Sequence, residues 1–220
     1  MKKLFILGFA VALACAAYAY PTLTGPTGLV IVPTAAVVPA GQLQVSMDWW
    51  YTFANTDAII PVRVMYGLND QFEIGAAYIT SEFGDSDVLG LNAKFVLPFT
   101  AADAAWAVGA SYLDAEDGDS SFGASLSVTK AFTENFNGTA ALLWNEEGFL
   151  TDEEFSIGLG AEAILENGLV LVGEYVNFLP GAELNMAARY PITEALTAQV
   201  GFVFNTSSPF IGATYAFGGE

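Results

Sequence analysis

Apolar and polar residues alternate along most of this chain in segments of roughly ten residues, and this period of two constrains the fold more than any other feature. In the segment 42–53, one parity holds Leu43, Val45, Met47, Trp49, Tyr51 and Phe53, and the other begins with Gln42, Gln44, Ser46 and Asp48. A helix would repeat its apolar residues at a spacing near 3.6, so the segment is predicted to be a strand. Many such segments, separated by turn-forming residues, predict a transmembrane β-barrel, in which one face of each strand meets lipid and the other faces the lumen.

Residues 1–19 are predicted to be a cleaved secretory signal peptide. Lys2 and Lys3 precede an apolar run from Leu4 to Ala14, and Ala17-Tyr18-Ala19 forms a small-x-small cleavage site. The run is too short for a membrane-spanning helix. We therefore expect secretion and a mature chain that begins at Tyr20.

The remaining 200 or so residues form one domain with room for about twelve antiparallel strands of membrane-spanning length. The expected strands are 42–53, 58–66, 71–79, 88–97, 104–113, 121–131, 136–145, 155–165, 169–177, 182–190, 195–204 and 210–217. The predicted fold is therefore all-β, an up-and-down barrel over residues 42–220.

Acidic residues gather in every second connection. Of 24 acidic residues, thirteen lie in four connections without Lys or Arg: Asp57; Glu82, Asp85 and Asp87; Asp114, Glu116, Asp117 and Asp119; Glu146, Glu147, Asp152, Glu153 and Glu154. We expect these loops to be extracellular and to alternate strictly with short periplasmic turns, so that both termini are periplasmic. Their charge repels nucleic acid.

Aromatic residues recur near the expected strand ends. The loop-side set is Trp49, Trp50, Tyr51, Tyr78, Tyr112, Phe122, Trp144, Phe155, Tyr175, Phe204 and Phe210; the turn-side set is Tyr66, Phe72, Phe95, Phe136, Tyr190 and Phe217. Two such sets predict aromatic girdles at the two membrane interfaces. A soluble β-sandwich would instead bury its aromatic residues in mid-strand.

The mature sequence resembles bacterial outer-membrane β-barrel proteins, whose last strand alternates, ends on an aromatic residue and is recognised by the barrel-assembly machinery. Ile211, Ala213, Tyr215 and Phe217 supply the alternation, although residues 218–220 follow them. The resemblance implies a Gram-negative outer membrane, with its lipids and the barrel-assembly machinery as partners. The stretches 27–29, 33–35 and 38–41 (Thr-Gly-Leu, Pro-Thr-Ala and Val-Pro-Ala-Gly) also resemble the opening of YjbH-like outer-membrane proteins, which are linked with exopolysaccharide.

Residues 20–41 form a separate N-terminal segment. They are apolar but contain Pro21, Pro26, Pro33 and Pro39, which exclude a continuous helix or a central strand. Two arrangements remain open. The segment is either a plug in the barrel mouth or an extended arm, packed on the rim or disordered.

The inward parity of the expected strands is mostly small or polar, which predicts a narrow aqueous lumen. Eight ionisable residues share this parity: Asp48, Arg63, Glu73, Lys94, Glu162, Glu174, Glu183 and Arg189. They either line water or pair with one another in a network of salt bridges. If they line water, five acids against three bases favour cations in transit.

The sequence offers few residues for a catalytic site or a metal site. The chain has no histidine and its one cysteine, Cys15, lies in the predicted signal peptide, so nucleophile–histidine pairs and Cys or His metal sites are excluded. The alternative for Cys15 is acylation by a lipoprotein pathway. A candidate cation site in a loop comprises Asp114, Glu116, Asp117 and Asp119, although a solvated acidic tip fits as well. No cofactor is expected.

The sequence therefore predicts a porin-like outer-membrane barrel that is a small passive channel for cationic or neutral solutes, with a preference for cations. The alternative is a structural or exopolysaccharide export-associated barrel whose lumen is closed.

Overall fold

The computed structural model describes residues 20–53, 57–81, 87–116, 120–146, 154–179 and 181–218. It contains twelve strands: β1 Leu43–Thr52, β2 Asp57–Asn69, β3 Phe72–Ser81, β4 Val88–Val96, β5 Ala105–Ala115, β6 Ser120–Thr133, β7 Phe136–Asn145, β8 Phe155–Ile164, β9 Val170–Leu179, β10 Gly181–Pro191, β11 Leu196–Val203 and β12 Ser208–Phe217. The predicted signal peptide lies outside the described residues.

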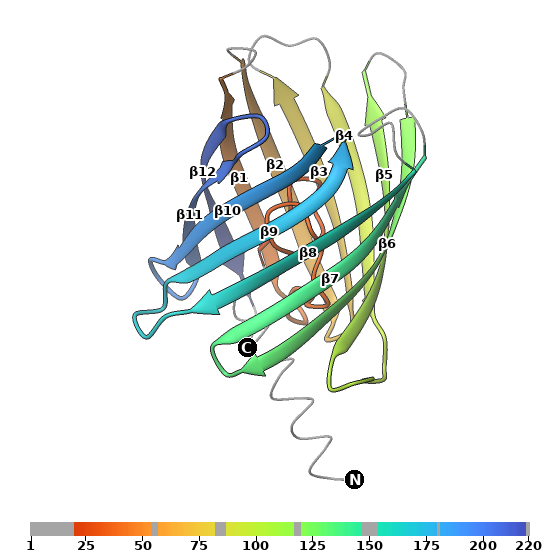
Figure 1. Cartoon of the computed structure of the whole chain (residues 1–220), viewed down its shortest axis with the longest axis vertical. Helices are drawn as coiled ribbons and strands as arrows, with labels where there is room; N and C mark the ends of the chain where they lie inside the picture. The colour runs from red at the N-terminus through yellow and green to blue at the C-terminus, as the bar shows by residue number, and fades with distance from the viewer. Residues whose placement is uncertain are drawn as a thin grey trace.

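The strands form one closed antiparallel barrel in chain order (Figure 1). β1 completes the circle by pairing with β12 from Leu43 opposite Phe217 to Trp50 opposite Phe210. Closure satisfies the backbone hydrogen bonds of both terminal strands and leaves no sheet edge, as the interior of a bilayer requires. The predicted all-β up-and-down barrel is confirmed. Among the described residues, no helix is long and apolar enough to cross a membrane.

The predicted strand boundaries lie within a few residues of the observed ones. β2 and β6 run further toward the connections than expected, and register irregularities at 67–69 and 131–133 continue their pairing past the predicted ends. We call the end of the barrel that carries residues 70–71, 134–135 and 192–195 the turn end, and the opposite end the loop end.

The predicted strict alternation of long loops and short turns is wrong. The turn-end connection 97–104 is longer than the loop-end connection between β5 and β6, and only residue 180 separates β9 from β10. The length of a connection depends on how far the pairing of its two strands extends. Connection length alone therefore does not tell which end of the barrel is which. The acidic residues of the loops are only partly described: Glu82, Asp85, Asp117, Asp119, Glu147, Asp152 and Glu153 lie outside the described residues.

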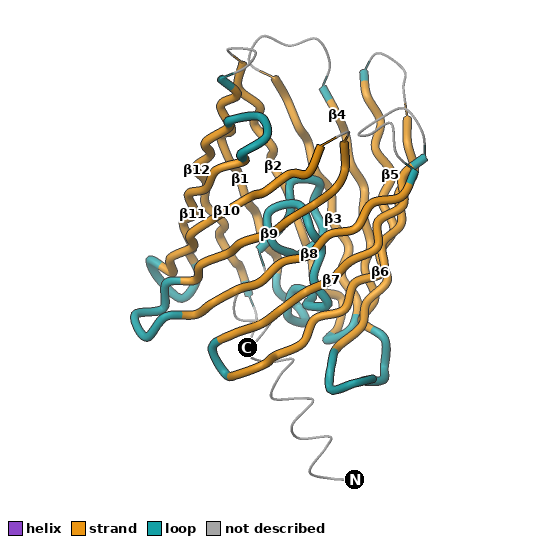
Figure 2. The backbone as a smooth tube through the Cα atoms, in the orientation of Figure 1, coloured by secondary structure: helices purple, strands orange, loops and turns teal. Residues whose placement is uncertain are grey.

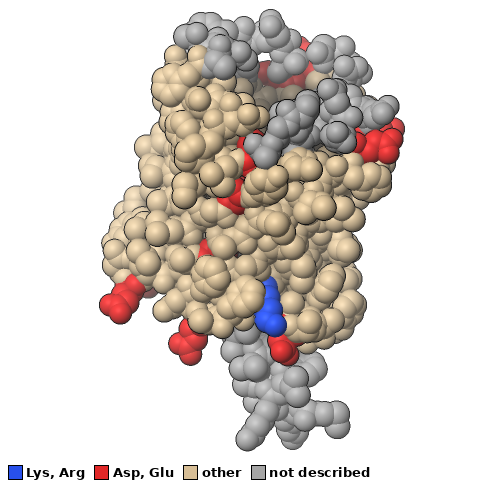
Figure 3. Space-filling model, in the orientation of Figure 1, with Lys and Arg blue, Asp and Glu red and all other residues tan. Residues whose placement is uncertain are grey.

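The outer surface of the barrel is apolar. Large hydrophobic side chains of alternate residues point away from the lumen, and Leu91, Ile157 and Ile211 are each more than half exposed. The face in Figure 3 carries few charged residues between its two ends. Soluble monomers rarely expose apolar surface on this scale, whereas a lipid-facing wall requires it.

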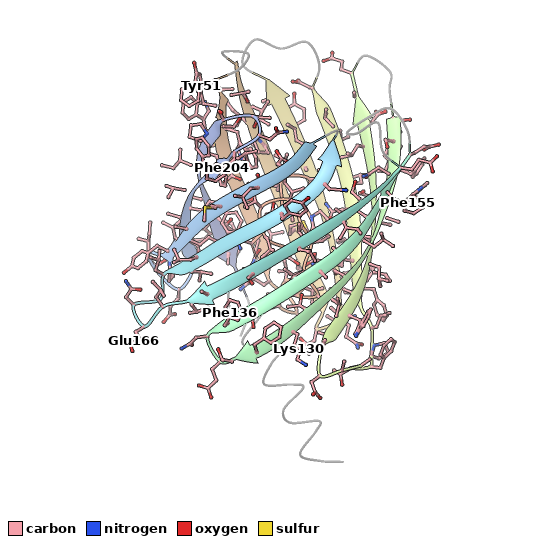
Figure 4. The ribbon with its side chains drawn as sticks, in the orientation of Figure 1. Tyr51, Lys130, Phe136, Phe155, Glu166 and Phe204 are labelled. Atoms are coloured by element: carbon pink, nitrogen blue, oxygen red, sulfur yellow. The ribbon has the colours of Figure 1, made fainter. Side chains whose placement is uncertain are left out.

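The residues of the two predicted aromatic girdles lie near the ends of the barrel, and two of them do not face the membrane. Figure 4 shows Tyr51, Phe155 and Phe204 toward the loop end and Phe136 toward the turn end. Trp50 and Phe210, which were assigned to the loop-side girdle, are instead buried inside the barrel, where their rings stack at 4.5 Å between centroids. Trp50 shares its parity with Asp48, and the parity, rather than the aromatic character, decides which face it takes.

The N-terminal segment lies inside the barrel. Figure 1 shows it as a coiled trace enclosed by the strands, and Figure 2 shows that it is loop rather than regular structure. Tight backbone contacts fold it back on itself, including Leu23 N to Val30 O at 3.0 Å and Leu29 N to Val32 O at 2.8 Å. It leaves the lumen at the turn end, where Gly41 has a φ of 73° and its N–H donates to the carbonyl of Gly67 at 2.8 Å.

Candidate functional site

The eight ionisable residues predicted for the lumen all lie on the inner face of the wall, and three acid–base pairs join six of them. Arg63 pairs with Asp48 at 2.5 Å, Lys94 with Glu73 at 3.1 Å, and Arg189 with Glu162 at 3.2 Å. In each pair both side chains are buried or nearly so. Two acids, Glu174 and Glu183, have no basic partner among the described residues.

The first pair holds the start of the N-terminal segment. Arg63 donates from Nη1 to the carbonyl of Thr22 at 3.1 Å, and the Tyr20 hydroxyl donates to Oδ1 of Asp48 at 3.1 Å. Gln199 donates to the same oxygen at 3.0 Å. Burial, reinforced by the charge of Asp48, raises the pKa of the Tyr20 hydroxyl, so this group stays protonated and remains a donor.

The second pair surrounds Thr27. Glu73 accepts hydrogen bonds from the Thr27 N–H at 2.9 Å and from the Val38 N–H at 2.8 Å. Lys94 donates to the Thr27 carbonyl at 2.7 Å and also contacts its hydroxyl. The Glu73–Lys94 pair therefore binds the N–H, the carbonyl and the hydroxyl of Thr27. The two charged side chains are stabilised by hydrogen bonds to the backbone of the N-terminal segment as well as by each other.

The third pair contacts the next turn of the segment. Arg189 donates from Nη2 to the carbonyls of Gly28 at 3.3 Å and Leu29 at 2.5 Å. Its guanidinium also lies 4.6 Å from the centre of the Tyr20 ring. A planar guanidinium has five N–H donors, so it can serve two carbonyls, a carboxylate and an aromatic face together.

Glu174 binds three consecutive backbone amides of the segment. The N–H groups of Val30, Ile31 and Val32 donate to its carboxylate at 3.0, 2.8 and 3.1 Å. Asn185 supplies a fourth donor at 2.8 Å. Successive N–H groups that converge on one point form a concave anion site, and here the wall provides the anion.

Apolar packing completes the docking. Leu29, Val30 and Val32 belong to one buried cluster with inward-facing residues of the wall, including Val172 and Val176 of β9. Gly160 of β8 leaves room for this contact, since a Cβ there would stand 2.1 Å from Cδ1 of Leu29. The small inward residues were predicted to leave an aqueous passage, but at Gly160 the N-terminal segment fills that space.

A cavity of about 260 Å³ lies on the loop side of the segment. Its lining includes Thr52 and Ser208 at the loop ends of their strands and Ile31 and Pro33 of the segment. The N-terminal segment is thus the floor of a chamber on the loop side. Glu183 lies in the wall of this chamber and is 8% exposed.

The candidate loop cation site is only partly described. Asp114 is the last residue but one of β5 and lies two positions before Glu116 in the sequence, whereas Asp117 and Asp119 lie outside the described residues. Within the ranges that the structure describes, no group of three or more His, Cys, Asp or Glu residues could hold a metal ion.

Several residues that anchor the segment were not predicted as such. Tyr20 was predicted only as the first residue of the mature chain, and Thr27 only as part of a stretch that resembles YjbH-like proteins. Gln199 and Thr129 were counted among the small or polar inward residues; Thr129 accepts from the Ala35 N–H at 2.9 Å. A signal was present in β9. Its inward parity holds Val170, Val172 and Val176 beside Glu174, and its outward parity holds Leu171 and Tyr175. Three inward valines on one strand require an apolar cover inside the barrel.

Known structures share the fold at low sequence identity. The KdgM porin superimposes with a TM-score of 0.65 at 10% identity, over 80% of this chain and 99% of that one, and its complex with disordered oligogalacturonate with 0.64 at 11% over the same shares. The NanC porin gives 0.65 at 8% identity over 78% and 98% of the two chains. Omp33 of Acinetobacter baumannii gives 0.58 at 13% over 80% and 97%.

No family model and no curated protein matches the sequence. The resemblance of the N-terminal segment to YjbH-like proteins therefore stays a prediction. The closed twelve-stranded barrel and its similarity to these porins show that the chain has the fold of a porin-type outer-membrane barrel.

Proposed function

We propose that this protein is a passive outer-membrane channel for small solutes that prefers cations and is narrowed at the turn end by its N-terminal segment. The observation that carries the proposal is the distribution of charge inside an apolar-walled barrel. Three bases are each neutralised by an acid, and Glu174 and Glu183 remain without a base among the described residues. An excess of fixed negative charge attracts cations into a lumen and repels anions.

The same charge argues against one solute class. One of the similar structures is the KdgM porin in complex with disordered oligogalacturonate, which is a polyanion. In this chain the loop-end chamber contains Glu183, and the described loop-end residues add Asp87, Asp114 and Glu116 without a base. Acidic oligosaccharides would meet repulsion at this entrance. We therefore infer small cationic or neutral solutes.

Planar bilayers test the channel and its selectivity together. The mature chain should give steady current, and a tenfold KCl gradient should give a reversal potential of cation-selective sign, below the limit of about 59 mV for one charge. Current with a reversal potential of the opposite sign would overturn the cation preference. Absence of current from folded protein would overturn the channel.

The alternative is a structural barrel with a closed lumen, and the extensive docking of the N-terminal segment favours it. A variant that lacks residues 20–38 separates the two functions. If the native chain passes no current and the deletion variant passes a steady current, the segment closes the lumen. A channel that is only narrowed should conduct in both forms, with a larger conductance after deletion.

Location in the outer membrane is inferred from the apolar wall. Cysteine labelling on intact cells tests it with a membrane-impermeant maleimide. Ser120→Cys at the loop end should react, whereas Asn135→Cys in a turn should react only after permeabilisation. The reverse labelling pattern would invert the proposed topology.

A further inference from the structure

The loop-side chamber is more apolar than a simple aqueous passage requires. Side chains of Leu113, Leu143 and Trp50 line its wall, and Ile31 of the N-terminal segment contributes to its floor. Trp50 is held by its stack on Phe210 and is 5% exposed. Ligand pockets typically combine such an apolar lining with a few polar groups that fix orientation.

Glu183 is the one ionisable residue that lines this chamber among the described residues. It is buried, and no hydrogen bond or ion pair joins it to another described residue. Glu183 of β10 lies opposite Val176 of β9, and Glu174 lies two positions from Val176 on β9. Its nearest charged neighbour along the wall is thus a second acid.

No Lys or Arg among the described residues is free to pair with Glu183. The sequence has six Lys and Arg residues, of which Lys2 and Lys3 belong to the predicted signal peptide. Arg63, Lys94 and Arg189 pair with other acids, and the ammonium of Lys130 donates to the carbonyl of Ala102 at 2.9 Å, in a turn-end connection. The connections at the loop end contain no Lys or Arg, described or not. In its ionised form Glu183 therefore takes its counter-charge from solution.

We propose that the loop-side chamber is a binding site for a small organic monocation with an apolar body, and that Glu183 is its counter-ion. The charge binds the ammonium group, and the side chains of Leu113, Leu143 and Ile31 contact the apolar body. Thr24 and Asn145 line the same chamber and offer oxygens to the remaining ammonium donors.

The size of the chamber limits the ligand. A volume of about 260 Å³ lies just below the roughly 300 Å³ at which pockets for drug-sized molecules begin. A monoamine with one ring or a short branched chain fits, and an oligomer does not. The inference deepens the proposed channel function and rests on it, because the ligand enters from the loop end as a transported solute would.

The test uses the refolded mature chain in detergent micelles and three probes that differ in charge alone or nearly so: benzylammonium, benzyl alcohol and benzoate. Titration calorimetry should show binding of benzylammonium that is roughly tenfold or more tighter than binding of benzyl alcohol, and no binding of benzoate. Equal affinity for benzylammonium and benzyl alcohol would overturn the site.

Variants assign the effect to the chamber. Glu183→Gln should lower the affinity for benzylammonium to that for benzyl alcohol, and Glu166→Gln, the same change in an exposed turn, should leave it unchanged. Ser125→Leu, which fills the chamber, should abolish binding of both. Retention of the heat-modifiable barrel shows that each variant is folded. Full affinity in folded Glu183→Gln would contradict the proposal.

Current measured on the same protein separates the two proposals. Steady current without benzylammonium binding overturns the site and leaves the channel. Binding without current supports the site and overturns the channel. Binding with current should be accompanied by a reduced potassium current when benzylammonium is added on the loop side.

Discussion

Replacement of Glu174 by alanine tests the docking of the N-terminal segment most directly. The change removes the acceptor of three amides, those of Val30, Ile31 and Val32, and leaves them buried without a partner. The strand ladders are unaffected, since Glu174 contributes only its side chain to this contact. The change should therefore release the segment and not the barrel.

The magnitude follows from the three contacts. A hydrogen bond to a charged group stabilises by about 1.5–3 kcal/mol net, which gives about 4.5 kcal/mol for three at the lower limit. Burial of the carboxylate offsets part of this gain, and we take about 3 kcal/mol as the loss of docking free energy. That loss corresponds to roughly a hundredfold increase in the fraction of undocked segment.

Hydrogen–deuterium exchange measures this fraction in the refolded protein. The amides of residues 30–32 should exchange about a hundredfold faster in Glu174→Ala, whereas the strand amides of β6 and β7 keep their protection. Glu174→Gln should fall between, because its one carbonyl oxygen still accepts hydrogen bonds. Glu166→Ala, in an exposed turn, should behave as the native chain does.

Two results would refute docking through Glu174. In the first, exchange at residues 30–32 stays close to the native rate in Glu174→Ala. In the second, exchange is faster throughout the barrel, since the carboxylate would then stabilise the whole fold rather than the docked segment.

The other predictions concern the segment's packing, the lipid face and one ion pair. Gly160→Val should displace the N-terminal segment, seen as larger single-channel current from a folded barrel, whereas Gly173→Ala, with no atom within 4 Å of the added Cβ, should leave the current unchanged. Leu91→Arg on the lipid face should cost about 2–4 kcal/mol in unfolding titrations, and Leu91→Ile should cost far less. Arg63→Met should leave the buried Asp48 carboxylate without its base and lower the free energy of unfolding by about 3–5 kcal/mol. An unfolding midpoint equal to the native value would show that the pair contributes nothing to stability.

The period of two in the sequence was enough to predict most of the fold. Because the parity of a strand fixes which side chains point inward, the sequence alone placed Asp48, Arg63 and the other ionisable residues on one face. The same parity also predicts that Trp50, at the next inward position after Asp48, points into the barrel. The assignment of Trp50 to the girdle was wrong because aromatic character near a strand end was given more weight than register.

Tertiary structure decided what the inward residues contact. Acids and bases that pair lie on neighbouring or more distant strands, and only barrel closure and register bring Arg189 of β10 to Glu162 of β8 or Gln199 of β11 to Asp48 of β1. The sequence left the position of the N-terminal segment open between a plug and an arm, because a proline-rich chain without periodicity has no preferred partner until a cavity of matching shape exists. The amides of the segment bind Glu174 and its valines pack against β9, although more than a hundred residues separate them in the sequence. The sequence therefore determined the barrel and the orientation of its side chains, and the closure of the barrel determined which of them bind the segment and which, like Glu183, line the chamber beside it.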